Sequence, residues 1–256
     1  LVANYACHPS AFGGGATRFH SPDFPWFAEQ ALGRRFGTAV PLHYWQGAAG
    51  DINPGKYVAE GSADEVRALG ERLADGIAAA CGRPTPLDGL LSVHHADGSY
   101  PAGPWVDDVG AARARFHACC DDVRAARAAG TPADAALVHR WRMAIKALDK
   151  ALLLRARSFE ARVHLVGIGP LALVFTAGEW FHSFGRELAR AAAPGTAWMT
   201  TLSDIDLLYM PDAAARARGA SYGVEPSMRT LSDPGLEELY ASMVRLVADY
   251  ARNRNE

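Results

Sequence analysis

Four short stretches of the chain place polar side chains directly after apolar runs, and they hold the residues that could do chemistry. They read NYACHP with His8, QGAAGDINPG with Asp51 and Asn53, TAGEWFH with Glu179, and LSDIDLLYMP with Tyr209. In α/β proteins, functional sites gather where strands end at their carboxyl edge. Imidazole, carboxylate and phenol groups are metal ligands or proton carriers, so these residue types point to metal or acid–base chemistry.

Each stretch also has a plain structural interpretation. The sequence GDINP is typical of a turn in which Asp51 and Asn53 bond their own backbone ahead of Pro54. Glu179 could be a first-turn carboxylate that the helix dipole favours, and Tyr209 a core tyrosine with a satisfied hydroxyl. Taken singly, no stretch is specific for a function.

The elements that must position these residues alternate between strands and helices. We expect strands at 1–6, 39–45, 87–95 and 196–202, a hairpin that turns at Gly169-Pro170, and helices that start at Pro25, Ser62, Glu179 and Leu236. Ser62 and Glu65 form a capping box at the second of these helices. The alternation predicts an α/β fold, a single domain whose mixed β-sheet is covered by helices.

Two Ala- and Arg-rich helices interrupt this alternation. They are expected over 109–129 and 132–154, with the break at Gly130-Thr131-Pro132. Their composition suits an exposed amphipathic pair, so the sequence predicts a helical hairpin inserted at about 107–157 and packed outside the site.

Composition excludes several classes of function. The 256 residues are 49% hydrophobic and 21% charged with a net charge of −2, which argues against a nucleic-acid partner and gives no anionic-membrane signal. No apolar run reaches the roughly 18 residues of a transmembrane helix. GGGA has no Lys-Ser/Thr after it and is not a P-loop. The four cysteines, Cys7, Cys81, Cys119 and Cys120, form no CxxC pair, and we expect buried or helical thiols.

The first residue is Leu1, and the first residues already have the pattern of a buried strand. We therefore expect an N-terminally incomplete or processed chain.

Taken in order, NYACHP, SPDFPWFAEQAL, QGAAGDINPG, AGEWFHSFGREL and LSDIDLLYMP resemble the motifs of the neutral/alkaline non-lysosomal ceramidase family. Typical members read roughly NFACHP, SADYPGYARE, QGACGDINP, PGEFFTELGLRLK and LANDYVGYIP. The resemblance spans about 1–60 and 158–250 and omits the middle helices. It implies that 1–256 is part of a ceramidase-like hydrolytic domain.

The resemblance implies a zinc-dependent amide hydrolase whose Zn²⁺ is held by two histidines, a glutamate and a tyrosine. On this chain the second histidine falls on His8, the glutamate on Glu179 and the tyrosine on Tyr209. A later tyrosine that stabilises the oxyanion matches Tyr222. The first histidine belongs to an upstream HTHS-like motif that this chain does not contain.

Two positions depart from the family pattern. Ceramidases carry a serine in a GDVSPN-like motif where this chain has Asn53, which can hydrogen-bond a substrate or water but cannot be a nucleophile. His182 is the second departure, either an ordinary histidine or an alternative ligand or proton shuttle. Asp51 is the expected partner of the second ring nitrogen of His8.

The sequence therefore predicts a zinc hydrolase that acts on a small-molecule or lipid-like amide other than ceramide itself. One alternative is a non-catalytic relative that keeps the fold and binds a ligand or partner; another is an amidase or esterase for sugars or cell-wall fragments. Family members are often secreted, which suggests a secreted or periplasmic location by analogy alone. The sequence leaves the oligomeric state open.

Overall fold

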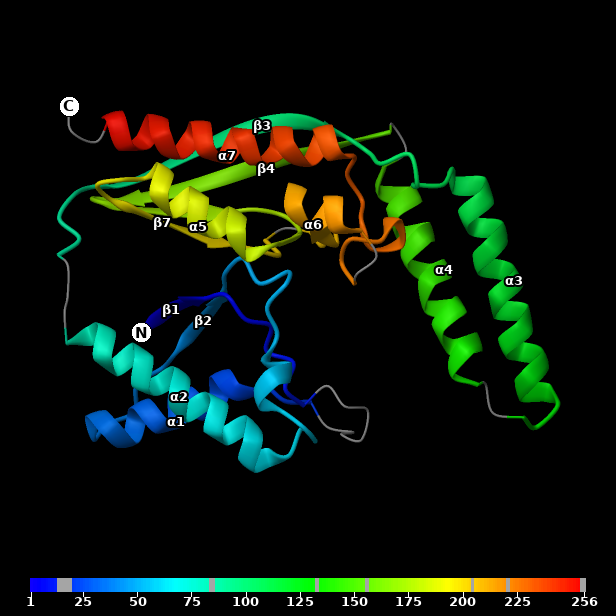
Figure 1. The fold of residues 1–256 in the computed structure, drawn as a ribbon, viewed down its shortest axis with the longest axis horizontal. Helices are drawn as coiled ribbons and strands as arrows, with labels where there is room; N and C mark the ends of the chain where they lie inside the picture. Colours follow the sequence, from blue (N-terminus) through cyan, green and yellow to red (C-terminus); the bar gives the residue numbers. More distant parts are fainter. Residues whose placement is uncertain are drawn as a thin grey trace. The chain divides into compact units, whose positions relative to one another are not determined.

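The computed structural model describes residues 1–12, 20–82, 86–131, 134–154, 157–203, 205–219 and 222–253. Helices and strands alternate along the chain as predicted (Figure 1), and the mixed α/β class with a helical hairpin is confirmed. The chain divides into two compact units. Unit 1 comprises 1–95, 163–206 and 243–256, and unit 2 comprises 96–162 and 207–242.

A short parallel sheet opens unit 1. Strand β1 (Val2–Tyr5) pairs with β2 (His43–Gln46) in a register that sets Asn4 opposite Trp45. Parallel strands point their carboxyl ends to the same edge, so the residues after β1 and those after β2 emerge side by side. This register is what brings the NYACHP and QGAAGDINPG motifs together.

Helices α1 (Phe24–Phe36) and α2 (Ala63–Cys81) pack against each other in unit 1 (Figure 1). The predicted capping box is present, because Ser62 accepts the Glu65 N–H and the Glu65 carboxylate accepts the Ser62 N–H. Gly70 allows the close approach of the helices, since a Cβ there would lie 2.4 Å from the Cβ of Phe27. Local signals in the sequence thus fix both the start of α2 and its packing face.

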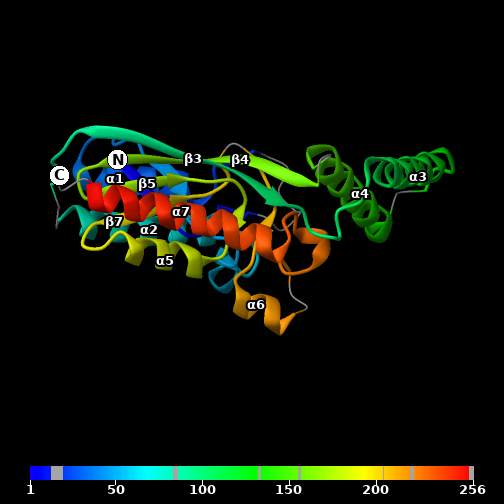
Figure 2. The same ribbon diagram turned by 90° about the horizontal axis from the view of Figure 1, so that it is seen from above.

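The larger sheet has the order β3-β4-β5-β7. Strands β4 (Ser158–Ile168) and β5 (Leu171–Phe175) form the predicted antiparallel hairpin, and Gly169 supplies the turn with a φ of 51°. Strand β7 (Thr196–Thr200) pairs with β5 in parallel, which makes the sheet mixed. The last turns of helix α7 (Asp233–Asn253) contact this sheet, since Tyr250 donates to the Gly169 carbonyl at 2.7 Å; α7 is drawn in red in Figures 1 and 2.

Several predicted boundaries are wrong. Strand β2 starts at His43 and not at residue 39, and β3 (Leu91–Pro101) starts and ends later than predicted. The helix expected from Glu179 is α5 (His182–Ala191), because Glu179 and Trp180 form the short extended element β6. The apolar run continues past Glu179, but the Asp51 carboxylate accepts the His182 N–H and places the helix start there.

Unit 2 contains the helical hairpin, with α3 (Val109–Ala128) and α4 (Ala135–Leu153) side by side (Figure 1). Asp108 and Asp134 cap their N-termini, and Gly130 provides the turn with a φ of 67°. Lys150 anchors α4 through bonds to the carbonyls of Ser227 and Arg229. The remaining elements of unit 2 are β8 (Tyr209–Met210) and α6 (Ala213–Arg218), and two 3-10 turns, at Pro54–Tyr57 in unit 1 and Pro226–Met228 in unit 2, complete the chain.

No helix within the described residues is long and apolar enough to cross a membrane. The four cysteines are free thiols, with Cys7 buried and Cys81 exposed, which agrees with the prediction of buried or helical thiols. The GGGA stretch and Pro132, both used in the sequence argument, lie outside the described residues.

Candidate metal site

The structure brings together His8 and Glu179, which lie 171 positions apart in the numbering. Their Nε2 and Oε2 atoms are 3.1 Å apart, within ion-pair distance. Both side chains are mostly shielded from solvent, with 20% and 11% of their surfaces exposed. The structure thus brings His8 and Glu179 side by side.

The geometry between His8 and Glu179 is unusual for a simple pair. The His8 Nε2 atom is buried and makes no hydrogen bond, although the carboxylate oxygen lies close enough to accept one. The two groups are therefore close to each other, but they do not have the geometry of a hydrogen bond. Two donors bound to one tetrahedral zinc at about 2 Å each lie about 3.3 Å apart. The observed 3.1 Å is compatible with an ion pair and also with two ligands of a common ion.

The end of β1 and the loop after β2 hold His8 in place. The His8 N–H donates to the carbonyl of Ile52 at 3.0 Å, and Cys7 beside it is buried. The same loop holds the strand that carries Glu179, because the Gly50 N–H donates to the Trp180 carbonyl at 2.8 Å. One loop thus fixes the backbone on both sides of the site.

Gly50 leaves no room for a side chain at this point. A Cβ at Gly50 would lie 2.4 Å from the Glu179 carbonyl oxygen, a distance that backbone atoms do not tolerate. The glycine therefore allows the loop to lie directly on the Glu179 backbone. Trp180, which follows Glu179, is fully buried and donates to the Ala177 carbonyl at 2.8 Å. Both contacts restrict the position of the Glu179 carboxylate.

The partner of the second His8 nitrogen is Gln46 and not Asp51. The Gln46 side-chain nitrogen lies 3.4 Å from His8 Nδ1. The oxygen and nitrogen of a side-chain amide are interchangeable in such a position, so the Gln46 oxygen can accept Nδ1–H and leave the Nε2 lone pair toward Glu179. The role of Gln46 was not predicted from the sequence, although Gln46 is the first residue of the QGAAGDINPG motif and the last residue of β2.

Asp51 contacts His182 instead, so its expected role as the orienter of His8 is wrong. One Asp51 carboxylate oxygen accepts the His182 backbone N–H at 2.7 Å, and the other lies 2.6 Å from His182 Nδ1. The loop geometry explains the difference, because Ile52 faces His8 with its carbonyl while Asp51 lies next to the start of α5. Asp51 and His182 form a carboxylate–imidazole pair in unit 1.

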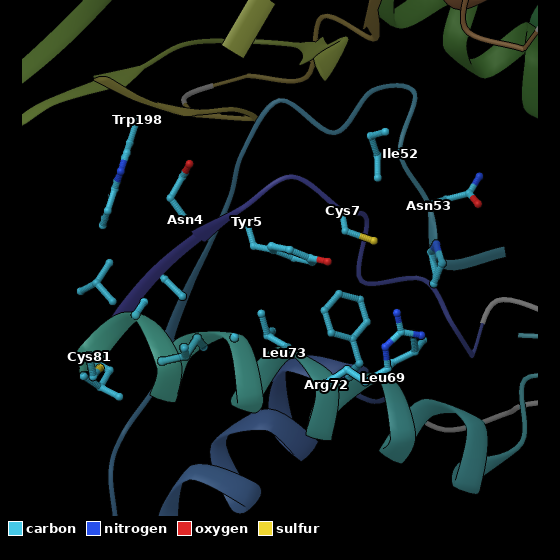
Figure 3. Close-up of a pocket in the computed structure, with 18 residues that line it drawn as sticks. Asn4, Tyr5, Cys7, Ile52, Asn53, Leu69, Arg72, Leu73, Cys81 and Trp198 are labelled. Carbon is cyan, nitrogen blue, oxygen red and sulfur yellow. The ribbon is translucent and has the colours of Figure 1, made fainter. Parts of the chain in front are cut away.

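Asn53 lies at one end of an apolar pocket of about 660 Å³ between β1 and α2 (Figure 3). Its side-chain oxygen accepts the Gly55 N–H at 2.9 Å, which is the turn geometry expected of GDINP. The pocket also contains Cys7 and Ile52, the neighbours of His8 in sequence and in hydrogen bonding. A contact between Asn53 and a substrate stays a prediction.

Tyr209 and Tyr222 belong to unit 2, where the structure places them together. Their rings lie edge to face with centroids 5.3 Å apart. Tyr209 is buried, whereas Tyr222 is 68% exposed. The two tyrosines that the resemblance selects are therefore neighbours, and their convergence with His8 and Glu179 stays a prediction.

The donors in unit 1 fit part of a zinc site. A histidine nitrogen and a carboxylate oxygen are both zinc ligands, and the unbonded, buried Nε2 is available for a metal. Within the described part of the chain, no group of three or more histidine, cysteine, aspartate or glutamate side chains could hold a metal ion. His8 and Glu179 are thus two candidate ligands.

Comparison with known proteins gives the fold a context. No protein-family model and no curated protein sequence matches the chain. Among solved structures, the chain is similar to the neutral ceramidase from Pseudomonas aeruginosa, with a TM-score of 0.61, 12% identity, and coverage of 98% of this chain and 44% of that one. A ceramidase complexed with C2 gives a TM-score of 0.66, 12% identity, and coverage of 99% and 45%.

The chain has a ceramidase-like fold and spans less than half of the length of these neighbours. At 12% identity the likeness shows the fold alone. The middle helices are covered as well, since the match extends over nearly the whole chain, whereas the sequence motifs omit 107–157.

Proposed function

We propose that the chain is the part of a zinc-dependent hydrolase that carries His8 and Glu179, and that the enzyme cleaves an amide bond. The observation that carries this proposal is the 3.1 Å approach of a buried, unbonded histidine nitrogen to a buried carboxylate. The ceramidase-like fold supports the same reaction class. The family pattern adds Tyr209 as a further metal ligand and Tyr222 as an oxyanion donor.

The residues of the chain have distinct tasks in this proposal. His8 and Glu179 would hold the zinc, and Gln46 would fix the His8 tautomer through Nδ1. When bound, zinc supplies a Lewis acid that polarises a carbonyl and acidifies water. The Tyr222 hydroxyl would donate a hydrogen bond to the oxygen on which negative charge develops.

The substrate is an amide with an apolar part. Most side chains that line the 660 Å³ pocket are apolar, and its end at Cys7, Ile52 and Asn53 lies beside the His8 segment. An apolar group would be buried there at a gain of about 25 cal/mol per Å² of its surface. Asn53 replaces the ceramidase serine, so we propose a lipid-like amide other than ceramide itself.

Zinc titration tests the metal part of the proposal. Because two ligands gather in unit 1, we expect weak but measurable zinc binding by this chain, seen as a rise in melting temperature with added Zn²⁺ and not with Mg²⁺. His8→Ala and Glu179→Gln should each abolish that rise. His94→Ala is the matched control, since His94 lies elsewhere in unit 1 with its Nε2 3.0 Å from the Ser92 hydroxyl.

Two outcomes would contradict the metal assignment. A zinc-induced rise that survives in both site variants would place the metal elsewhere, and tight stoichiometric zinc would require ligands beyond His8 and Glu179. Zinc binding at the site without hydrolysis of any N-acyl amide, in a protein that carries all of the ligands, would instead favour the non-catalytic alternative.

A further inference from the structure

An exposed apolar stripe runs along α4 in unit 2. Val138, Trp141 and Leu152 are large apolar side chains, and each is 37% exposed. Half-buried Ile145 and Leu148 continue the stripe between them. The five residues follow one another at intervals of three, four, three and four, which is the heptad spacing of a coiled-coil seam. We call this stripe the α4 seam.

The α4 seam lies beside the sector of α4 that is already buried. The buried positions are Leu137, Ala144, Lys150 and Ala151, and the three apolar ones each precede a seam residue by one position in the sequence. Because each residue turns the helix by about 100°, Val138 and Leu152 are rotated by that angle from the buried residues Leu137 and Ala151 that precede them. The seam extends about 21 Å at 1.5 Å per residue, long enough for one more helix to lie along it.

Two charged residues flank the seam on the same side. Arg142 and Asp149 each follow a seam residue, Trp141 or Leu148, and occupy the same heptad position seven residues apart. Both are exposed. Neither side chain makes a hydrogen bond or ion pair with any residue of the described chain, whereas the side chains of Arg115 and Arg124 of the neighbouring helix are both paired.

Arg142 and Asp149 are arranged for self-complementarity. They lie at equal distances on either side of the midpoint between Ile145 and Lys146. In an antiparallel pair of identical helices related by a two-fold axis at that midpoint, this flanking position faces its own equivalent. Arg142 of each copy would then face Asp149 of the other, and the apolar stripes would face each other between them.

We propose that the α4 seam is a self-association surface, and that its occupant is the α4 seam of a second copy of this chain. The two copies pack antiparallel, and the two hairpins together form a four-helix bundle. Burial of the stripe supplies the affinity, and the two Arg142–Asp149 contacts fix the register and direction. This inference does not depend on the proposed hydrolase activity.

Charge exchange between copies tests the arrangement. By light scattering after size exclusion, the chain should approach twice its 27.4 kDa mass as its concentration rises. Arg142→Asp and Asp149→Arg each turn two attractive contacts into two repulsive ones, so each variant alone should weaken dimerisation about tenfold or more. An equimolar mixture of the two variants should recover the dimer, because every facing pair is then opposite in charge.

The controls separate this geometry from folding defects and from other surfaces. Ile145→Asp should give a monomer, and Arg140→Asp, on another side of α4, should dimerise like the wild type. Circular dichroism and thermal melting show that each variant is folded. A wild-type chain that stays monomeric at the highest attainable concentration would overturn the proposal, and so would a mixture of Arg142→Asp and Asp149→Arg that does not re-form the dimer.

Discussion

At the scale of single residues, Asp51 connects the loop after β2 to the start of α5. Its two carboxylate oxygens engage the backbone and the imidazole of the same residue, His182. The carboxylate therefore acts as the missing N-cap of α5, whose own N-cap residue, Phe181, has no side-chain bond to offer.

Asp51→Ala should lower the free energy of unfolding by about 1–2 kcal/mol, because it removes a helix cap and a charge-assisted hydrogen bond. Urea unfolding measures this loss, and Asp51→Asn should lose less because its oxygen can still accept the His182 N–H. Zinc binding should weaken far less than in His8→Ala. An equal loss of zinc in both variants would place Asp51 at the metal.

The sequence predicts those site residues that lie within a recognisable motif. His8 and Glu179 could be paired in advance because each follows an apolar run and each matches a family motif. Gln46 could not, because its role depends on the parallel register that sets it opposite Tyr5, three residues before His8. Such a register is a tertiary property that residue types alone do not encode.

At the scale of elements, the start of α2 depends on one carboxylate. Glu65 accepts the backbone N–H groups of Ala59, Glu60 and Ser62. These bonds lower the pKa of Glu65 from 4.5 to about 2, and the bonds from Ala59 and Ser62 have the largest effects. A lowered pKa means that this contribution to stability is fully present above pH 4.5 and is lost as the pH falls toward 2.

Glu65→Gln should therefore be less stable than the wild type at pH 6, and the difference should shrink as the pH falls from 4.5 toward 2. Urea midpoints at a series of pH values measure it. Glu71→Gln, on the same helix, controls for the loss of one carboxylate, because Glu71 makes only a solvent-exposed ion pair with Arg34. A difference between Glu65→Gln and wild type that stays constant to pH 2 would show that the charge at Glu65 is not what stabilises the turn.

Element boundaries that depend on adjacent residues could be predicted from the sequence. Boundaries that depend on residues far away in the chain could not. The capping box marked α2, and the Gly169-Pro170 pair marked the β4–β5 hairpin, because capping and turn geometry are written in adjacent residues. The start of α5 was misplaced by three residues because its cap comes from Asp51, more than a hundred positions away. Strand β3 was displaced because it continues through Asp97-Gly98, a pair that is typical of turns, where Arg162 of the neighbouring strand β4 pairs with Asp97.

At the scale of the whole molecule, the two tyrosines that the family pattern selects, Tyr209 and Tyr222, both belong to unit 2, whereas His8 and Glu179 belong to unit 1. If Tyr209 is a metal ligand together with His8 and Glu179, Tyr209→Phe should weaken the zinc-induced stabilisation, because the phenol oxygen is the only group removed. Tyr222→Phe should leave it unchanged, since an oxyanion donor does not hold the metal. Thermal melting with and without Zn²⁺ measures both variants, and identical behaviour of the two would assign Tyr209 no part in binding.

The composition of the units has a consequence for synthesis. Unit 1 is assembled from three stretches of chain, and the last of them, 243–256, leaves the ribosome after all of unit 2 has been made. The Tyr250 hydroxyl, which bonds to the β4–β5 turn, arrives with that stretch. The usual order, in which the N-terminal part of a nascent protein folds first, does not apply here. The bond between Tyr250 and the β4–β5 turn therefore forms only after unit 2 has been made, whereas every residue that lines the apolar pocket, within 1–81 and at Trp198, is already present by then.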